Sequence, residues 1–456
     1  MTSFVSIDPT TGERFADYPA LDARQIDRAL DAARAAFAAW QRADVAERVA
    51  PLRRAAEILE ARTDAYALLM AREMGKPLRE GRAEILKCTS VCRYYAAEAA
   101  AMLADQPRPS DAARSYVSPR PLGVVLGIMP WNFPFWQAIR FSAPTLAAGN
   151  TVLLKHAPSV TGCALALEAL WHEAGVPEGG FQILLAELDQ LPAVIADPRV
   201  AAVSLTGSSR AGRAVAAAAG AALKPCVLEL GGSDPAVVLA DADLELAVEQ
   251  CAVGRLINAG QSCIATKRII VSRPLRAAFE EALLARLARL RVGDPRDEAT
   301  ELGPLAREDL RDALARQVTQ SVAAGAVCRL GGQAPSGAGW YYPVTLLTDP
   351  PPGSPACREE LFGPVATLIE AADEEDAIRL ANDTAYGLGA AIYSRDSARA
   401  EAIARDRLEA GSAFVNAFVR SDPRLPFGGT KDSGWGRELG REGLLAFTSA
   451  KTVWVA

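Results

Sequence analysis

The stretch Val124-Val-Leu-Gly-Ile-Met-Pro-Trp-Asn-Phe-Pro134 decides how this chain folds. Its first half, Val124–Met129, is a short β-branched apolar run typical of a buried strand, and a proline-bounded turn and a helix follow it. The same order, a strand followed by a helix, recurs directly afterwards, with a strand over Thr151–Leu154 and a helix over about Thr161–Ala174. Strands that alternate with helices imply parallel, right-handed βαβ crossovers. We therefore expect an α/β fold with a doubly wound, Rossmann-like sheet.

The alternation continues along the rest of the chain. Further strands of the first sheet are expected at Phe181–Leu185, Ala202–Leu205 and Val227–Leu230. After Gly231-Gly232 a second alternating region begins, which predicts a second α/β unit with its own core. Its expected strands are Pro235–Leu239, Arg268–Val271, Val365–Ile369, Ala390–Tyr393 and Ala413–Asn416, and its helices include Leu244–Leu256 and Leu275–Leu290.

The two ends of the chain have sequence patterns that differ from this alternation of strands and helices. The first hundred residues read as helical, because Ala-rich segments such as Asp27–Trp40 and Arg48–Leu69 space apolar residues by three and four. Arg114–Pro119 alternates and predicts a short exposed strand. The apolar end, Thr452–Val455, needs a strand partner, which is either Arg114–Pro119 or another subunit.

Composition narrows the classes of function. The chain has 456 residues, of which 50% are apolar and 23% charged, and its net charge is −6. This length suggests about two or three domains, and the mildly acidic balance predicts no affinity for nucleic acid or anionic lipid. We find no signal sequence at the amino terminus and no apolar run of membrane-spanning length. The expectation is a soluble cytoplasmic protein.

The cysteine and histidine counts exclude several chemistries. There are 8 cysteines and 2 histidines. In a long chain without an export signal, free thiols are expected rather than disulfides. Because the chain has no Cys-x-x-Cys and no clustered histidines, we expect no metal site. Its two histidines also leave few candidates for the Ser-His-Asp triad of a hydrolase.

Cys263 and Glu229 together suggest covalent catalysis. Cys263 lies in the polar run Asn258–Ala265, which predicts a loop or a helix start, and a helix N-terminus lowers the pKa of a thiol. Glu229 ends an apolar strand and precedes two glycines, an unusual place for a purely structural carboxylate. The plain alternatives are a core cysteine and a salt-bridged or edge-strand glutamate. A thiolate can add to a carbonyl, and a carboxylate can activate the water that releases the product.

Other polar residues follow strand ends, where ligands bind in open α/β sheets. Asn132 follows the strand Val124–Met129, and its amide could stabilise an oxyanion, although asparagine also favours plain turns. Thr206–Gly212 is a strand-to-helix turn that could hold phosphate, or an ordinary tight turn. Lys155 and Arg140 are either solvated surface cations or contacts to ribose, phosphate or a carboxylate.

The ordered set of motifs resembles the NAD(P)-dependent aldehyde dehydrogenase superfamily. The motifs are Pro130–Pro134, Lys155, Thr206–Ser208, Glu229–Gly232, Gly260–Cys263, Glu359–Pro364 and Pro426–Gly429. The match is collinear and spans almost the whole chain, so the set is far more specific than any one motif. A narrower set resembles the bacterial succinate-semialdehyde dehydrogenase group: Met129–Pro134 with Arg140, Leu154–Pro158, Cys226–Asp234 and Gly293–Asp297.

The resemblance implies catalytic roles. Cys263 would be the nucleophile, Glu229 the general base for deacylation, and Asn132 an oxyanion donor together with the Cys263 backbone N–H. For an NAD or NADP cofactor it implies Lys155 at the adenosine ribose, Gly207 and Ser208 at the pyrophosphate, Glu360 at the nicotinamide ribose, and Trp131 and Phe362 along the cofactor.

For the substrate, the resemblance implies that Arg140 binds a carboxylate and that Phe427 walls the tunnel. A second carboxylate-binding arginine of some relatives falls at Ile257 and is absent, and we expect Arg424 to substitute for it. Residues Ile264 and Ala265 follow the nucleophile, so no second cysteine forms a redox switch there. Because Pro158 stands where NAD-selective relatives often carry a glutamate, nothing there repels a 2′-phosphate, and NADP use stays open.

The expected activity is oxidation of succinate semialdehyde to succinate with NAD(P)+, through a thiohemiacetal and a thioester. The alternatives are a dehydrogenase for another small aldehyde (uncharged, amino or other ω-carboxy) and a dinucleotide-binding protein without turnover. We expect a dinucleotide-binding domain over residues 1–107 and 122–231 and a catalytic domain over 232–442. Residues 108–121 and 443–456 resemble the family's small β oligomerisation arm, which implies a homodimer or homotetramer.

Overall fold

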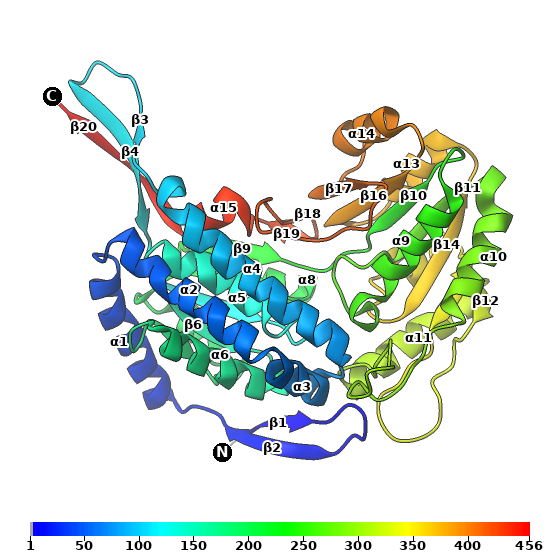
Figure 1. The fold of residues 1–456 in the computed structure, drawn as a ribbon, viewed down its shortest axis with the longest axis horizontal. Coiled ribbons are helices and arrows are strands. Elements are labelled where there is room, and N and C mark those ends of the chain that lie inside the picture. Colours follow the sequence, from blue (N-terminus) through cyan, green and yellow to red (C-terminus); the bar gives the residue numbers. More distant parts are fainter. Residues whose placement is uncertain (1–2) are drawn as a thin grey trace.

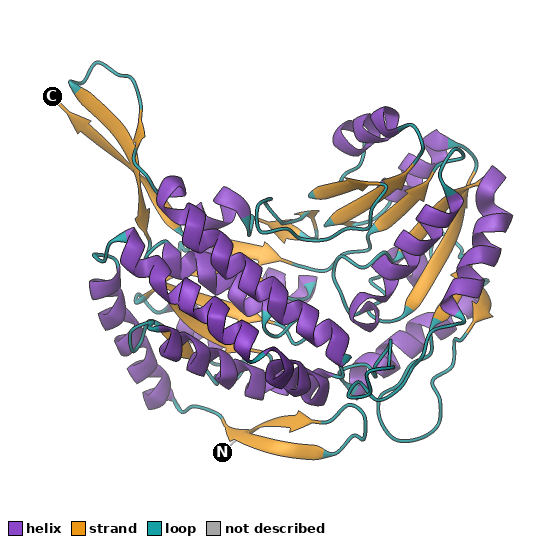
Figure 2. Cartoon of the chain, viewed as in Figure 1, coloured by secondary structure: helices purple, strands orange, loops and turns teal. Residues whose placement is uncertain are grey.

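The computed structural model describes residues 3–456, and a six-stranded sheet forms the centre of one half of the molecule (Figures 1 and 2). Its order is β19-β9-β8-β5-β6-β7, and only β19 runs antiparallel to its neighbour. The strands are β5 (Val124–Met129), β6 (Thr151–His156), β7 (Phe181–Ile183), β8 (Val200–Thr206), β9 (Cys226–Glu229) and β19 (Gly434–Trp435). After β5 the chain adds β6 and then β7 on one side of the sheet, and after β8 it adds β9 on the other side. The sheet is therefore doubly wound, as predicted, with its switch point between β5 and β8.

Helices cover both faces of this sheet, which explains why its strands are apolar without alternation. Along β5, Val125 belongs to the core under one helical layer, whereas Val124 and Leu126 belong to the core under the other. The first layer comprises α2 (Val45–Ala61), α3 (Thr63–Met74), α4 (Leu78–Met102), α5 (Trp136–Ala147) and α6 (Thr161–Ala174). The second comprises α1 (Ala23–Trp40), α7 (Leu191–Ala196) and α8 (Ser209–Ala221).

A seven-stranded sheet forms the centre of the other half, in the order β12-β13-β14-β11-β10-β16-β17. Its strands are β10 (Pro235–Val238), β11 (Arg268–Ser272), β12 (Val327–Leu330), β13 (Thr345–Thr348), β14 (Val365–Ala371), β16 (Gly389–Tyr393) and β17 (Ser412–Val415). Its helices are α9 (Leu244–Leu256), α10 (Arg276–Leu287), α11 (Glu308–Ala324), α12 (Pro355–Arg358), α13 (Glu374–Asn382) and α14 (Ser397–Asp406). All neighbours are parallel except β12 and β13. The predicted second α/β unit is present, although the sequence pattern did not reveal β12 and β13.

A ribbon of antiparallel strands projects from the body (Figure 1). It consists of β4 (Arg114–Pro121), β20 (Thr448–Val455) and the short β3 (Gln106–Pro107). The register of β20 against β4 runs from Thr448 opposite Pro121 to Val455 opposite Arg114. The apolar carboxyl-terminal strand thus finds its partner within the chain, which is the first of the two alternatives that the sequence left open.

The expectation of helices throughout the first hundred residues is wrong at the start. β1 (Ser3–Ile7) and β2 (Arg14–Pro19) form an antiparallel hairpin. The turn between them is closed by hydrogen bonds to the Asp8 carbonyl, and Gly12 there has φ 78°, a conformation that favours glycine.

Smaller elements complete the fold: β15 (Tyr386–Gly387), β18 (Thr430–Lys431), α15 (Gly440–Leu445), and the 3₁₀ turns η1 (Pro158–Val160), η2 (Ile257–Gly260) and η3 (Arg273–Leu275). Within residues 3–456, no helix is both long enough and apolar enough to cross a bilayer. The domain boundaries given above stay a prediction.

Candidate active site

Two cavities meet at Cys263. The first, here the α4 cavity, encloses about 790 Å³ and is lined by residues of α4 and α5, the Cys263 loop and the segment 419–427. The second, here the switch-point cavity, encloses about 690 Å³ and lies outside the ends of β5 and β8. Cys263 and Gln137 line both.

The switch-point cavity is built by the loops that follow β5 and β8. The first loop supplies Trp131 and Asn132, and the second supplies Gly207 and Ser208. Ser208 is the N-cap of α8, with its hydroxyl accepting from the Ala211 N–H at 3.3 Å. A helix N-terminus beside a cavity favours bound phosphate.

The far wall of this cavity carries Glu360 and Phe362, and the Phe362 ring meets Trp131 edge to face at 5.8 Å. The Gly232 N–H donates to Glu360 Oε1 at 3.1 Å, and Lys267 Nζ lies 3.4 Å from the same oxygen. A Cβ on Gly231 would overlap the other Glu360 oxygen. The glycines after β9 thus let a carboxylate from the second half of the molecule reach the switch point.

Lys155 does not line either cavity. It lies in β6, one strand away from the switch point, and is buried. Burial lowers its pKa to about 8. Of the six residues expected to contact a cofactor, the structure therefore brings together Trp131, Gly207, Ser208, Glu360 and Phe362 around one cavity.

Cys263 sits in a turn between η2 and β11, so the sequence alternative of a helix start does not apply. Lys267 Nζ donates to the Ser262 carbonyl at 2.7 Å and also to the Cys263 carbonyl. Burial raises the pKa of the thiol to about 12, against the opposing charges of Lys267 and Arg140. The thiol is therefore protonated in this state, and the lowered pKa expected from a helix terminus is not found.

Glu229 ends β9, opposite Gly434 of β19. Its side chain is only 2% exposed, and neither carboxylate oxygen has a hydrogen-bond partner within residues 3–456. Burial raises its pKa well above the usual range, and the nearby charge of Arg140 acts in the opposite direction. Glu229 is not among the residues that line either cavity. It is therefore a buried carboxyl group with free acceptors that lines neither cavity.

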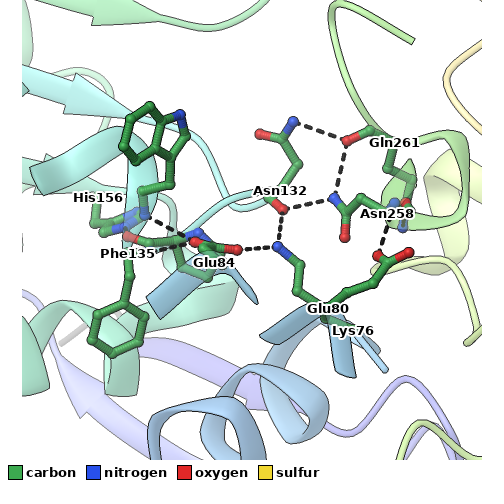
Figure 3. Close-up of polar contacts among 10 residues, drawn as sticks. Lys76, Glu80, Glu84, Asn132, Phe135, His156, Asn258 and Gln261 are labelled. Carbon is green, nitrogen blue, oxygen red and sulfur yellow. Dashed lines mark hydrogen bonds and ion pairs between the residues drawn. The ribbon is translucent and has the colours of Figure 1, made fainter. Parts of the chain in front are cut away.

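A buried polar network fixes the loop that carries Asn132 (Figure 3). Lys76 forms a buried ion pair with Glu84 and donates to the Asn132 carbonyl at 3.0 Å. The other Glu84 oxygen accepts the N–H groups of Phe135 and Trp136, each at 2.9 Å. One carboxylate on α4 thus satisfies both a lysine and the first amides of α5.

The same network ties Asn132 to the nucleophile loop (Figure 3). Asn258 Nδ2 donates to the carbonyls of Asn132 and Gln261, and Asn132 Nδ2 donates to Gln261 at 2.9 Å. Asn258 adopts φ 55° and Ala259 φ 52°, a left-handed turn that a non-glycine residue seldom adopts. The Glu80 carboxylate accepts the Asn258 N–H at 2.8 Å and supports this turn.

His156 fixes the end of the loop that carries Asn132. Its Nδ1 accepts the Ala157 N–H at 2.8 Å, so its proton is on Nε2, which lies 2.9 Å from the Pro134 carbonyl. Burial lowers the pKa of His156 to about 4, which keeps the imidazole neutral.

The three residues expected at the substrate end have different positions. Arg140 and Phe427 line the α4 cavity, and the Arg140 guanidinium lies 5.0 Å from the Phe427 ring centre. Arg140 also forms a buried ion pair with Glu438. Arg424 does not line the cavity, because its exposed guanidinium turns back to Asp422 at 2.6 Å. The loop brings Arg420 to the cavity instead.

Sequence reasoning missed Lys76, Glu84, Lys87, Lys267 and Arg420. One signal was available. Glu80, Glu84 and Lys87 recur at helical spacing, which places them on one face of α4, and all three line the α4 cavity. No grouping of three or more histidine, cysteine, aspartate and glutamate side chains suited to a metal ion occurs in the part of the chain that the structure describes.

Known proteins match the chain over its whole length. The model of the aldehyde dehydrogenase family matches residues 1–453. The chain is 47% identical over 453 residues to Sad of Escherichia coli, a succinate semialdehyde dehydrogenase named for NAD(P)+, covering 99% of this chain and 98% of that protein. It is 47% identical over 454 residues to a probable NADP+ succinate-semialdehyde dehydrogenase of Synechocystis, covering 100% of both.

A solved structure agrees. The succinic semialdehyde dehydrogenase of Streptococcus pyogenes, crystallised with NADP+, superimposes with a TM-score of 0.97 at 36% identity, covering 99% of each chain. The doubly wound sheet, the two cavities that meet at one cysteine and these matches lead to one conclusion. The chain belongs to the aldehyde dehydrogenase family.

Proposed function

We propose that this chain oxidises succinate semialdehyde to succinate with NAD(P)+, with Cys263 as the nucleophile. One observation carries the proposal: Cys263 lines both the α4 cavity and the switch-point cavity. A sulfur in that position can bond to an aldehyde carbon held on one side while the same carbon faces a hydride acceptor on the other. The names of the full-length relatives support succinate semialdehyde as the substrate.

The switch-point cavity fits a dinucleotide. Gly207 and Ser208 at the start of α8 suit a pyrophosphate, Glu360 suits the hydroxyls of a ribose, and Trp131 and Phe362 form flat walls. When bound, NAD(P)+ supplies the hydride acceptor. Lys155 is proposed for the adenosine ribose on the family resemblance alone. Pro158 brings no negative charge against a 2′-phosphate, so both cofactors are expected to bind.

The first chemical step belongs to Cys263. Cys263 gives its proton to water, a loss that the charges of Lys267 and Arg140 favour, and the thiolate then adds to the aldehyde carbon. The resulting oxyanion is proposed to accept hydrogen bonds from Asn132 Nδ2 and the Cys263 backbone N–H. Asn132 has one amide hydrogen engaged by Gln261, which leaves the second for this oxygen. Loss of hydride from the tetrahedral carbon leaves a thioester on Cys263.

Glu229 is proposed to release the product. It takes a proton from water, the resulting hydroxide attacks the thioester carbonyl, and succinate leaves as the Cys263 sulfur is restored. Burial raises the pKa of Glu229, which makes the carboxylate a stronger base. Because neither oxygen has a hydrogen-bond partner within residues 3–456, no hydrogen bond is lost when the side chain turns toward the thioester.

An aldehyde panel tests this function. Purified protein is assayed for reduced nicotinamide with succinate semialdehyde, butanal and 4-aminobutanal, each with NAD+ and with NADP+. Succinate semialdehyde is expected to have the highest kcat/KM, by about 10–100-fold over butanal, since a hydrogen bond to a charged group contributes about 1.5–3 kcal/mol. Preference for an uncharged, amino or different ω-carboxy aldehyde would assign the alternative substrate. Dinucleotide binding without turnover would assign a non-catalytic role, and Cys263→Ala gives the reference for that state.

We also propose a cytoplasmic homodimer or homotetramer. The ribbon of β4 and β20 supports this, since β20 is an edge strand with Trp454 54% exposed. An exposed edge with an apolar side chain suits pairing with a second copy. Light scattering of the full chain and of a variant that ends before β20 tests it: the variant is expected to be a smaller species.

A further inference from the structure

Lys87 is an unexplained cation in the α4 cavity. It lies on the inner face of α4 and lines the cavity together with Cys263. Within the described chain, residues 3–456, no carboxylate oxygen lies within 4.0 Å of its ammonium nitrogen. The nearby Glu84 is committed to Lys76 and to two backbone amides. Lys87 is half-buried, and a partly desolvated cation without an ion-pair partner is costly, so its retention here calls for a reason.

The contacts of Lys87 point its ammonium group toward an anion. Nζ donates to the Ser421 hydroxyl at 2.7 Å and lies 4.3 Å from the centre of the Trp136 ring. A hydroxyl that accepts from lysine keeps its own hydrogen for donation, and the lysine has two further hydrogens. Lysine and serine from separate segments thus present donors to the same side of one cavity.

The other charges of the cavity are compensated, with one exception. Arg140 forms an ion pair with Glu438. The positive charge of Arg140 also acts on Glu229, whose pKa it lowers against the larger effect of burial. Glu80 accepts the Asn258 N–H, and burial raises the pKa of Glu80 to about 7, so it is not a full negative charge near neutral pH. Arg420 is the exception; it is exposed and forms no ion pair with the residues that the structure describes. The Lys87 end of the cavity is therefore positive.

We propose that Lys87 and Ser421 form the anion-binding end of the α4 cavity and hold the ω-carboxylate of an aldehyde whose carbonyl carbon lies at Cys263. This deepens the proposed function and rests on it. Arg420, exposed and lining the same cavity, adds a positive charge that draws the substrate in. Arg140 instead forms a buried ion pair with Glu438. Ile257, where some relatives carry a carboxylate-binding arginine, lines the same cavity, and Lys87 supplies a cation there from α4.

Lys87→Met tests the proposal, because methionine keeps the length of the side chain and its contact with Trp136 while removing the charge. The KM for succinate semialdehyde is expected to rise about 30-fold with little change in kcat, while kcat/KM for butanal changes less than about threefold. Lys87→Arg is expected to recover most of the loss, and Ser421→Ala to raise the KM about fivefold. Arg93→Met is the matched control, since Arg93 is an exposed cation on the same helix that pairs with Glu60.

Two results separate the failures. If the wild-type enzyme shows no preference for succinate semialdehyde over butanal, the proposed function fails. If the wild type shows that preference and Lys87→Met retains it in full, the proposed function stands and the Lys87 anchor is refuted. If Lys87→Met loses activity toward both aldehydes equally, its melting temperature and dinucleotide binding show whether it is folded. A folded variant with this result also refutes the anchor. If the variant is unfolded, Lys87→Arg and Ser421→Ala test the anchor in its place.

Discussion

The side-chain amide of Asn132 is held by Gln261, through a 2.9 Å hydrogen bond from Nδ2 to the carbonyl oxygen two residues before Cys263. Asn258 bonds to the carbonyls of both residues, so the two loops form one unit (Figure 3). The donor proposed for the oxyanion and the proposed nucleophile come from different halves of the molecule. Their relative position is set by these bonds rather than by the chain between them, which is the preorganisation that electrostatic stabilisation of a transition state needs.

Asn132→Ala is expected to lower kcat for succinate semialdehyde by about 10²–10³, the usual effect of losing one oxyanion donor. The reason is the loss of Nδ2, while the backbone carbonyl of residue 132 still accepts from Lys76 and Asn258. The KM and the melting temperature are expected to change little. A kcat within threefold of wild type would show that Asn132 serves only the loop structure.

Lys76→Met is expected to destabilise the fold by about 3–5 kcal/mol, because it leaves Glu84 as a buried carboxylate without its cation. Thermal unfolding measures the loss. The double variant Lys76→Met with Glu84→Gln is the control, since glutamine removes the charge and its oxygen still accepts from Phe135 and Trp136. The double variant is expected to be more stable than the single one; equal stability would mean that the ion pair is not the cause.

The strands of the sheet followed from sequence because their signals are local, whereas the switch point depends on the strand order, which only the structure gives. Runs such as Val124–Met129 are apolar on both faces, and polar residues at strand ends can be read directly. The predicted and observed limits of that strand are the same. The amino-terminal hairpin was missed because β1 is short and the Ala-rich helix α1 dominates the periodicity of its neighbourhood.

The charged residues of the α4 cavity were harder to predict. A lysine on an Ala-rich helix usually lies in solvent, and only the packing of α4 against α5 and the Cys263 loop turns Lys87 inward. The choice between Arg420 and Arg424 depends on Asp422, which captures Arg424 in the folded loop. A loop has no periodicity from which such an orientation can be read.

Glu229→Gln is expected to stop the cycle at the thioester. Glutamine has nearly the same shape but does not accept a proton from water, so about one reduced nicotinamide per active site is expected in a burst, followed by slow turnover. The intact mass of the protein after mixing with cofactor and succinate semialdehyde is expected to rise by one acyl group. Cys263→Ala, treated in the same way, is the control and is expected to show neither burst nor adduct. Full turnover by the glutamine variant would remove Glu229 from the mechanism.

The preference for succinate semialdehyde over butanal is expected to fall as pH rises through about 8. Burial lowers the pKa of Lys87 to about 8, with Arg140 adding to the lowering and Glu84, Cys88 and Asp422 opposing it. A lysine with a lowered pKa is a cation below that value and neutral above it, so the carboxylate loses its partner on the alkaline side.

The ratio of the two kcat/KM values, measured between about pH 6.5 and 9.5, isolates this effect, because both aldehydes share the titrations of Cys263 and Glu229 in the free enzyme. In Lys87→Arg the ratio is expected to stay flat, because guanidinium does not titrate there. A flat ratio in the wild-type enzyme would show that the group which recognises the carboxylate does not titrate near pH 8, and that result would remove Lys87 from this role.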